Sequence, residues 1–350
     1  MEGVFGMEYT PLFDNHCEIR MKNRKTVEAY CNCKDDDRQD RWMLYASKRD
    51  TSQKDGFLTA EGFLDPGPFA GADCSLAKKR SDEMENLRCF PVWNFYNNVY
   101  FENESDPNWI IVEGDGSGYS HRDPAHPLPH KDHYFNVFRL EDGQITSYVE
   151  LRNATREFRE EGRDLKYPHI EKFEAMYEIV AEGDDWDEPF VPTAKDDPVL
   201  RKKNTETIQK FLQFCGKDCA KRWELFTEDC TAGPGYSLDG KVRRILGRDA
   251  LKAAEALRAE CFPDWKFGEN KFHYTSDPNY ILVTNYGQGV CAGYSETPFV
   301  FREYMYHTFV MEDGKIKSYR EYYEPQKLAL LTGFDMNLPV FGPPFGADTM

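Results

Sequence analysis

Residues 140–150 read LEDGQITSYVE, and residues 311–321 read MEDGKIKSYRE. In each stretch an Asp-Gly pair separates two strand-like runs, which is a strong signal for a β-hairpin. Four more stretches recur upstream in the same order. They are residues 22–30 (KNRKTVEAY) and 203–211 (KNTETIQKF), 40–45 (DRWMLY) and 221–226 (KRWELF), 87–93 (LRCFPVW) and 259–265 (AECFPDW), and 105–112 (SDPNWIIV) and 276–283 (SDPNYILV). Five ordered matches predict a tandem duplication of one domain, because a solenoid needs several shorter units.

The two copies differ slightly in length. The offset between them is 181 residues at the start (22 to 203) and 171 at the end (150 to 321), so the first copy carries about ten extra residues. We place copy one at residues 21–166 and copy two at residues 200–333. The remaining segments are an N-terminal extension (1–20), an acidic, Pro-containing linker (167–199) and a Pro/Gly-rich tail (334–350).

Each copy has the same predicted order of elements. Apolar residues at helical spacing mark residues 26–30 and 205–214, and a second helix ends at each CFP motif, with Asp249 as the predicted N-cap in copy two. A helix should stop before Pro91 and Pro263. Strand patterns follow at residues 93–101, 108–114 and 134–140 in copy one, and at 271–275, 279–287 and 304–311 in copy two. Helices followed by an antiparallel meander predict the α+β class, in which each sheet curls around its helices and encloses one apolar cavity.

Composition excludes several classes of partner. The chain has 350 residues and a formal net charge of −17, which argues against nucleic acid and against an anionic membrane surface. The apolar runs are too short for a transmembrane helix, and the N-terminus lacks the basic and apolar regions of a signal peptide. We therefore expect a cytoplasmic protein that binds neither nucleic acid nor membranes.

The cysteines and histidines do not indicate a metal site. In a long chain without an export signal, the ten cysteines are better explained as free, mostly buried thiols than as five disulfides. Cys31 with Cys33, and Cys215 with Cys219, lack the second half of a zinc site. The histidines of residues 121–133 follow no standard spacing, and their neighbouring prolines indicate a long loop. The GDGSG stretch (114–118) is predicted to lie between strands and not before a helix, which argues against a phosphate loop.

The repeated motifs resemble the PhzA/PhzB family of phenazine-biosynthesis proteins. The resemblance lies in the KN opening, the R-W-x-L-F/Y segment, CFP-x-W, DPN followed by an aromatic residue, and an ending of the form H-x-F…E-D-G-x-I-K…R-E. Copy two carries the closer version, in RWELFTED (222–229), ECFPDW (260–265) and YHTFVMEDGKIKSYRE (306–321). The matching stretches span roughly four-fifths of the chain.

This family belongs to the SnoaL-like, ketosteroid-isomerase-like group within the NTF2-like superfamily. The resemblance implies two cone-shaped α+β barrels, each with N-terminal helices, a curved antiparallel sheet and a ligand pocket inside the cone. It also implies dimers in which an arginine from one subunit completes the pocket of its neighbour, so that a tandem duplication forms a covalent pseudo-dimer. Family members use no metal or organic cofactor and assist the condensation of a small cyclic amino ketone. A carboxylic acid whose pKa is raised by burial suits that chemistry.

The family's acid/base glutamate corresponds to Glu321 in copy two and to Glu150 in copy one. Strand alternation puts Glu321 on the same face as Tyr319, and Glu150 on the same face as Tyr148. This face either lines the pocket or is solvated, because a one-residue slip in hairpin register exchanges the two faces.

The arginine that crosses the dimer interface in the family corresponds to Arg41 and Arg222. In that role it would bind a substrate carboxylate through two parallel hydrogen bonds. The alternative is a structural arginine that packs over the adjacent Trp42 or Trp223, or that forms an ion pair on a helix.

The chain departs from the family pattern on the helix that ends at the CFP motif. The family presents a histidine and a serine there, where copy one has Asp82 and Asn86 and copy two has Ala254 and Arg258. This departure argues against the family's own condensation reaction. Copy one could pair Asp82 with Glu150, and copy two could use Arg258 as an anion clamp, unless these positions face solvent.

His133 and His307 lie in the third strand-like segment of their copies, at positions that are not equivalent. Each is a candidate proton relay or ligand hydrogen-bonding group, and the alternative for each is a structural histidine.

We therefore predict an enzyme without a cofactor that performs acid/base chemistry on a small carbonyl-bearing or aromatic metabolite of a secondary-metabolite pathway. The reaction would be a condensation, cyclisation, dehydration or isomerisation, with Glu321 and Glu150 exchanging protons and Arg222 and Arg41 orienting an anionic substrate. Two alternatives keep the fold: a cofactor-free oxygenase acting on an electron-rich aromatic substrate, and a non-catalytic small-molecule-binding pseudo-dimer. The two domains are expected to pair within the chain, and a further homo-oligomer is compatible with the sequence.

Overall fold

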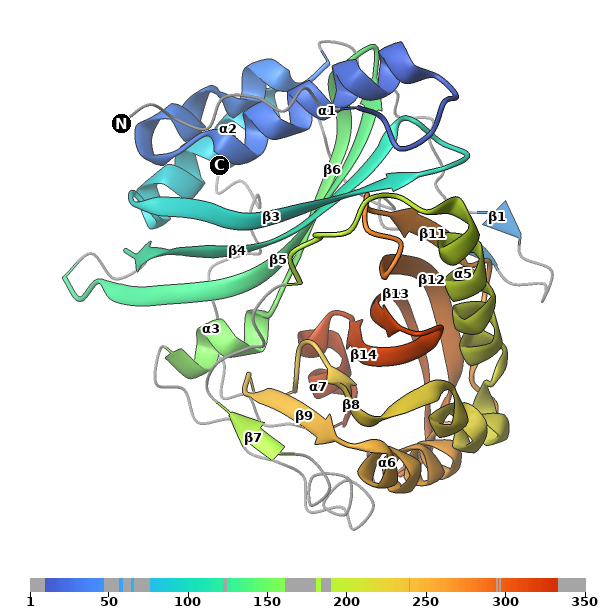
Figure 1. Ribbon diagram of the computed structural model, residues 1–350. Coiled ribbons are helices and arrows are strands. Elements are labelled where there is room, and N and C mark those ends of the chain that lie inside the picture. The colour runs from blue at the N-terminus through green and yellow to red at the C-terminus, as the bar shows by residue number, and fades with distance from the viewer. Residues whose placement is uncertain are drawn as a thin grey trace.

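Two copies of one α+β fold lie side by side in the computed structural model (Figure 1). The structure describes residues 10–46, 57–58, 64–65, 76–121, 125–160, 181–183, 190–238, 240–293, 295 and 297–332. The predicted tail and most of the predicted linker lie outside these residues, as does Cys74.

In copy one, helices cover a meander of long antiparallel strands. These elements are α1 (Cys17–Asn32), the 3₁₀-helix η1 (Asp35–Leu44), α2 (Leu76–Cys89), β3 (Trp93–Asn103), β4 (Trp109–Ser120), β5 (Leu128–Glu141), β6 (Gln144–Arg152) and α3 (Ala154–Glu160). A small hairpin of β1 (Phe57–Leu58) and β2 (Leu64–Asp65) forms a separate sheet.

Copy two repeats this order, and between its 3₁₀-helix and the helix that follows it has two longer strands where copy one has the small hairpin. Its elements are α5 (Pro198–Gln213), the 3₁₀-helix η2 (Gly216–Leu225), β8 (Phe226–Pro234), β9 (Val242–Leu246), α6 (Arg248–Cys261), β10 (Lys266–Phe267), β11 (Lys271–Tyr274), β12 (Tyr280–Cys291), β13 (Phe299–Glu312), β14 (Lys315–Tyr322) and α7 (Pro325–Thr332). A short strand, β7 (Ala181–Gly183), pairs with β9. The predicted α+β architecture is confirmed.

The sheets of the two copies join edge to edge. The strand order is β6-β5-β4-β3-β11-β12-β13-β14-β8-β9-β7, so the junction lies between β3 and β11 (Figure 1). There His273 pairs with Asn103, and Tyr274 pairs with Glu102. The tandem duplication therefore forms a pseudo-dimer within one chain.

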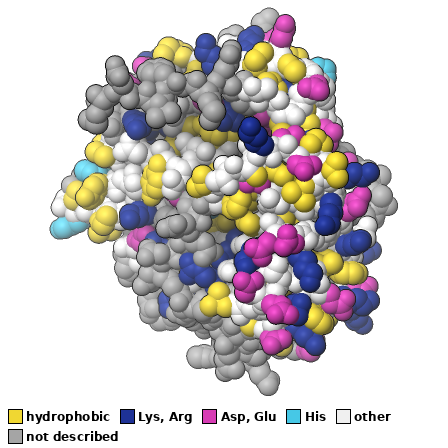
Figure 2. Space-filling model, viewed as in Figure 1, with side chains coloured by type: hydrophobic (Ala, Val, Ile, Leu, Met, Phe, Trp, Pro, Cys, Tyr) yellow, Lys and Arg dark blue, Asp and Glu magenta, His cyan; other side chains and the backbone are white. Residues whose placement is uncertain are grey.

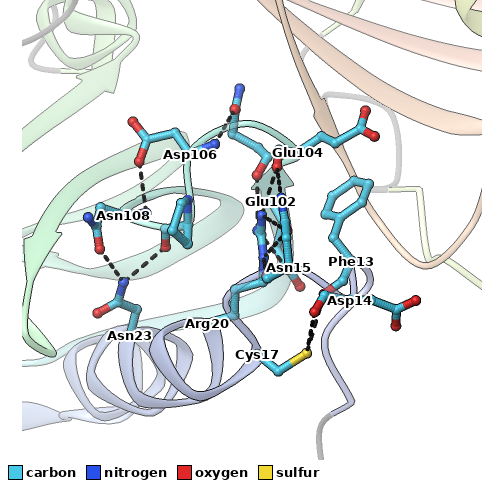
Figure 3. Close-up of polar contacts among 12 residues, drawn as sticks. Phe13, Asp14, Asn15, Cys17, Arg20, Asn23, Glu102, Glu104, Asp106 and Asn108 are labelled. Atoms are coloured by element: carbon cyan, nitrogen blue, oxygen red, sulfur yellow. Dashed lines mark hydrogen bonds and ion pairs between the residues drawn. The ribbon is translucent and has the colours of Figure 1, made fainter.

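The asparagines of the repeated motifs tie each first helix to its sheet. The side-chain amide of Asn23 on α1 donates to the carbonyl of Pro107 at 2.9 Å and to Oδ1 of Asn108 at 3.0 Å (Figure 3). Asn204 on α5 makes the equivalent bonds in copy two. The KN and DPN motifs thus have a structural role in both copies.

The two predicted hairpins are confirmed. Asp142 and Gly143 have φ angles of 50° and 75°, and Asp313 and Gly314 have φ angles of 53° and 79°. A two-residue turn of this kind needs positive φ at both positions, which Asp-Gly adopts readily. In copy one Thr26 on α1 also donates to the carbonyl of Gly143, at 2.6 Å.

Some local predictions are wrong. Helix α6 begins at Arg248 after Gly247, which has a φ of 84°, so Asp249 lies in the first turn and is not the N-cap. The GDGSG stretch lies inside β4, where a Cβ on Gly116 would come within 2.3 Å of the ring of Trp93. Glycine is needed there because this ring packs directly on the strand.

The histidine-rich tract is only partly a loop. Strand β5 begins at Leu128, so His130 and His133 lie on a strand, whereas His121 and His126 precede it. The sequence patterns also did not predict β8 and β9, which form the wall of copy two beyond β14.

The outer faces of the two sheets pack against each other. Buried residues of both copies form one apolar cluster there, in which the rings of Phe135 and Tyr306 stack with centroids 5.4 Å apart. Further clusters fill the two cones. The interface is therefore an apolar layer between two sheets, which adds to the single strand pairing at β3 and β11.

The segment before α1 connects the two copies. Phe13 is buried in the core of copy two, where its ring centroid lies 5.9 Å from that of Tyr274. Arg20, 5.0 Å above the Phe13 ring, donates to the carbonyls of Asn103 and Glu104, both at 2.9 Å (Figure 3). Part of the predicted N-terminal extension therefore packs on the second copy.

The surface and the thiols agree with the composition. Acidic and basic side chains are interspersed on the face in Figure 2, most densely over the part of copy two where α5 and α6 lie. The nine cysteines that the structure describes are free, as predicted. No described helix is long and apolar enough to cross a membrane.

Candidate functional site

Among the described residues, one cavity lies inside each copy and another lies between the two copies. The copy-one cavity, inside the first cone, has a volume of about 310 Å³, and the copy-two cavity has about 130 Å³. The interdomain cavity, between the two sheets, has about 90 Å³. Most predicted site residues line the first two: Arg41, Asp82, Asn86, Tyr148 and Glu150 in copy one, and Arg222, Arg258, Tyr319 and Glu321 in copy two.

Glu321 is held by Arg258 in the copy-two cavity. Strand β14 turns Glu321 inward, where it is 5% exposed, and Nη2 of Arg258 on α6 donates to its two oxygens at 2.5 and 2.7 Å. Burial alone would raise the pKa of Glu321, but the charge and hydrogen bonds of Arg258 outweigh it and lower the pKa below its ordinary value. The expectation of a glutamate with a raised pKa is wrong here, because Glu321 is a carboxylate.

A tyrosine and a histidine lie behind this carboxylate. The hydroxyl of Tyr319 lies 2.9 Å from Oε2 of Glu321 and 3.0 Å from Nδ1 of His307. Oδ1 of Asn285 accepts from Nε2 of His307, and burial lowers the pKa of this histidine to about 3. Nδ1 is then an acceptor, so the single hydroxyl proton of Tyr319 is shared between two acceptors. His307 thus reaches the site through Tyr319 and does not line the cavity itself.

Arg222 does not cross to the other copy. It is buried on η2, and its Nε donates to the carbonyls of Phe211 and Phe214 at 3.2 and 2.7 Å. Its guanidinium lies 4.3 Å from the ring centroid of Phe211 and 3.8 Å from Glu255. The predicted crossing and the packing over Trp223 are not observed. The ion pair predicted as an alternative is present, with Glu255 on α6, and Arg222 lines the cavity of its own copy.

Arg41 has the same arrangement in copy one. Its guanidinium lies 4.4 Å from the ring centroid of Tyr30 and 5.3 Å from that of Phe95, and Nη2 donates to the carbonyl of Cys33 at 3.1 Å. Arg41 therefore packs on these rings and not on Trp42. The predicted anion-binding arginines belong to separate cavities, each within its own copy.

The copy-one glutamate has different neighbours. Glu150 on β6 is exposed, and its Oε2 accepts from the hydroxyl of Tyr148 at 3.1 Å. Asn136 pairs with Glu150 across β5 and β6 as His307 pairs with Glu321 across β13 and β14, and its Oδ1 accepts from Tyr148 at 2.7 Å. An amide thus takes the place of the histidine.

The structure brings three carboxyl groups to the copy-one cavity. Asp82 on α2 is half-buried and Glu150 is exposed, and both line the cavity as predicted. Glu83, also on α2, was missed by the sequence analysis and is only 3% exposed. The repeat carried a signal for it, because Glu83 and Glu255 both lie six residues before the cysteine of the CFP motif.

His133 is not in either cone. Its Nδ1 lies 2.9 Å from Asp115 and its Nε2 lies 3.0 Å from Glu113, on the wall of the interdomain cavity. Its ring stacks on Tyr322 of copy two, with centroids 5.6 Å apart. Burial would lower the pKa of His133, but the hydrogen bonds to Asp115 and Glu113 outweigh it and raise the pKa to about 9. His133 therefore lines the interdomain cavity and is not among the residues of the copy-one cavity with Glu150.

Metal ligands do not gather in the described part of the chain. Within it, no three His, Cys, Asp or Glu side chains lie close enough together to hold a metal ion. Arginine, lysine and aromatic rings surround the carboxyl groups of the copy-one cavity instead.

The fold and its cavities define a tandem duplication of one α+β domain, with a cavity inside each copy. The chain belongs to the phenazine biosynthesis protein A/B family, whose model matches residues 7–173 and 188–339. The family, the fold class and the tandem duplication are thus confirmed, and the chain is a member of a secondary-metabolite biosynthesis family.

Similar proteins come from Pseudomonas. The phenazine biosynthesis protein PhzB 2 of Pseudomonas aeruginosa is 36% identical over 135 residues, which are 82% of that protein and 38% of this chain. The phenazine biosynthesis protein PhzA2 of the same species is 31% identical over 139 residues, 82% of its length and 38% of this chain. The crystal structure of a phenazine biosynthesis-related protein (phzb2) from Pseudomonas aeruginosa matches 42% of this chain and 92% of its own, with 30% identity and a TM-score of 0.37.

Proposed function

We propose that the protein is an acid/base enzyme for a small carbonyl-bearing metabolite and that the reaction takes place in the copy-one cavity. The observation that carries this proposal is the difference between the two glutamates. Arg258 donates hydrogen bonds to Glu321, whereas copy one has Asn86 at the corresponding position, and Asn86 and Glu150 both line the copy-one cavity. Hydrogen bonds and charge from an arginine lower the pKa of a carboxylate, as they do for Glu321, and so weaken it as a base.

The walls of the copy-one cavity suit a small ring that carries an anionic group. Arg41 and Lys79 supply positive charge, and Trp93, Phe95 and Tyr134 supply aromatic surface. A positive pocket also explains how a protein of net charge −17 can bind an anion.

In this proposal Glu150 removes a proton from the carbon or nitrogen next to the substrate carbonyl. Tyr148 holds the carboxylate in place through its hydroxyl at 3.1 Å. Arg41 and Lys79 bind the anionic group and fix the ring. Condensation, cyclisation, dehydration and isomerisation can each include such a proton transfer.

The test uses 3-oxocyclohexane-1-carboxylate as a probe in deuterated water. NMR measures the rate at which the hydrogens next to its carbonyl exchange for deuterium. Glu150→Gln is expected to slow the enzyme-dependent exchange about 100-fold, the usual effect of removing a general base. Glu141→Gln, an exposed carboxylate at the end of β5, is the matched control. Equal rates for wild type and Glu150→Gln contradict the proposal, and a loss confined to Glu321→Gln moves the reaction to the copy-two cavity.

A further inference from the structure

We infer that Glu83 is the proton donor of the copy-one cavity, so that Glu83 acts as the acid and Glu150 as the base. The inference rests on the proposed function and adds a residue to it. It assigns the acid to Glu83 on α2 and not to its neighbour Asp82, the carboxylate predicted from the sequence.

The position of the Glu83 carboxyl supports this role. Glu83 is 3% exposed and lines the cavity. Its Oε1 accepts from the hydroxyl of Tyr30 at 3.4 Å. Its Oε2 is buried, and no group in the described residues forms a hydrogen bond with it. A buried carboxylate oxygen without a donor is costly, whereas a protonated one can donate to a ligand.

The charged and titratable side chains that line the cavity with Glu83 come from five elements. They are Tyr30 on α1, Arg38 and Arg41 on η1, Lys79 and Asp82 on α2, Tyr134 on β5, and Tyr148, Glu150 and Arg152 on β6. Burial raises the pKa of Glu83 above its ordinary value, against the opposing charges of Arg41 and Lys79, while Glu150 acts in the same direction as burial. Two carboxyl groups whose environments differ in this way can divide the roles of acid and base.

The step conserves protons and electrons. Glu150 takes a proton from the carbon next to the carbonyl, and the electron pair of the broken C–H bond forms the C=C bond of an enol. The carbonyl oxygen receives the proton of Glu83 as its π electrons move onto oxygen. Glu83 becomes a carboxylate and Glu150 a carboxylic acid, and reversal of the step restores both.

Copy two supplies a matched control. Glu255 occupies the same helical position as Glu83 and is equally buried, at 4% exposed. Its Oε2, like that of Glu83, has no hydrogen-bond partner among the described residues, but it lies 3.8 Å from Nη1 of Arg222, in the cavity that the proposed reaction does not use. Glu255→Gln therefore repeats the chemical change of Glu83→Gln without altering the copy-one cavity.

The first experiment measures protonation directly and needs no substrate. Infrared spectra of the full chain at pH 7 are compared for wild type, Glu83→Gln and Glu255→Gln in the C=O stretching band of protonated carboxylic acids. Burial raises the pKa of Asp132 to about 7, so Asp132 contributes to all three spectra. The measured quantity is therefore the difference between each variant's spectrum and that of the wild type. Loss of intensity in Glu83→Gln alone is expected. Identical bands in wild type and Glu83→Gln overturn the inference. This outcome does not depend on whether the proposed function is correct.

The second experiment uses the exchange of 3-oxocyclohexane-1-carboxylate. Glu83→Gln is expected to lower the rate about 100-fold, and the high-pH limb of the pH–rate profile is expected to disappear. Glu83→Asp restores part of the rate, and Glu255→Gln leaves it unchanged. Loss in Glu150→Gln with full activity in Glu83→Gln overturns this inference and leaves the proposed function standing. Full activity in both overturns the proposed function as well.

Discussion

The guanidinium of Arg258 donates to the two carboxylate oxygens of Glu321, at 2.5 and 2.7 Å, across the wall of the copy-two cavity. In copy one the same two positions hold Asn86 and Glu150. The two copies share one order of elements. The copy-two cavity nevertheless contains an arginine–glutamate ion pair, whereas the copy-one cavity has an asparagine and a glutamate at those positions.

Removal of Arg258 is expected to destabilise copy two in a pH-dependent way. Arg258→Met leaves the buried Glu321 without its partner, so the free energy of unfolding at pH 8 should fall by roughly 3 kcal/mol. Without Arg258, burial raises the pKa of Glu321, and the loss should shrink as the carboxyl protonates toward pH 5. Urea unfolding at both pH values measures this.

The wild type should show the opposite slope at acidic pH. Its Glu321 has a pKa below the ordinary value of 4.5, so the stabilisation is present above that value and is lost as the pH falls through the lowered pKa. The double variant Arg258→Met/Glu321→Gln is the control and should recover most of the stability. An equal loss at pH 5 and pH 8 in Arg258→Met contradicts the argument.

An arginine introduced into copy one at the position of Arg258 should weaken Glu150 as a base. Asn86→Arg places a guanidinium where Arg258 stands in copy two, within the cavity that Glu150 lines. An arginine partner lowers a carboxylate's pKa by a unit or more, so probe exchange should slow about 10-fold. Asn86→Gln, which adds length without charge, should leave the rate nearly unchanged. Exchange at the wild-type rate in Asn86→Arg would show that Glu150 is not the base.

The interface between the copies should weaken in alkali. His133 has a pKa raised from 6.5 to about 9 by Asp115 and Glu113, against the effect of burial. Its stabilisation is complete below pH 6.5 and is lost as the pH rises through 9, which amounts to roughly 3 kcal/mol. The difference in unfolding free energy between wild type and His133→Gln, measured from pH 6 to pH 10, should shrink accordingly. A constant difference contradicts this prediction.

The contact of Phe13 with copy two should be measurable as stability. Phe13→Ala removes a ring that is buried in the core of copy two, next to Tyr274, and should cost about 3 kcal/mol. Phe13→Leu retains most of the apolar volume and should cost much less. Urea midpoints of the full chain provide the comparison, and equal midpoints for wild type and Phe13→Ala would show that this segment does not stabilise the pseudo-dimer.

Local signals in the sequence predicted a large part of the fold. Turns such as Asp142-Gly143 and helix ends before Pro91 and Pro263 depend on neighbouring residues only, so a pattern suffices to place them. Strands β8 and β9 were missed because β8 pairs in parallel with the distant β14, a contact without a local pattern.

Local patterns could not predict which face of the sheet each strand side chain lies on. On β5, His133 and Phe135 face the interface, whereas Tyr134 and Asn136 face the cone. A shift of one residue exchanges these sets, and the register depends on long-range pairing. Glu83 was missed for a similar reason, since its burial depends on η1 and β6, which lie far from α2 in the sequence.

The pairing of β3 with β11 has a consequence for how the two cavities can change. In a dimer of identical subunits, symmetry copies every substitution into both pockets. Here the paired strands belong to one polypeptide, so a new residue at one position has no obligatory twin. Arg258 can therefore stand opposite Glu321 while Asn86 stands in copy one, and natural selection can act on each cavity separately.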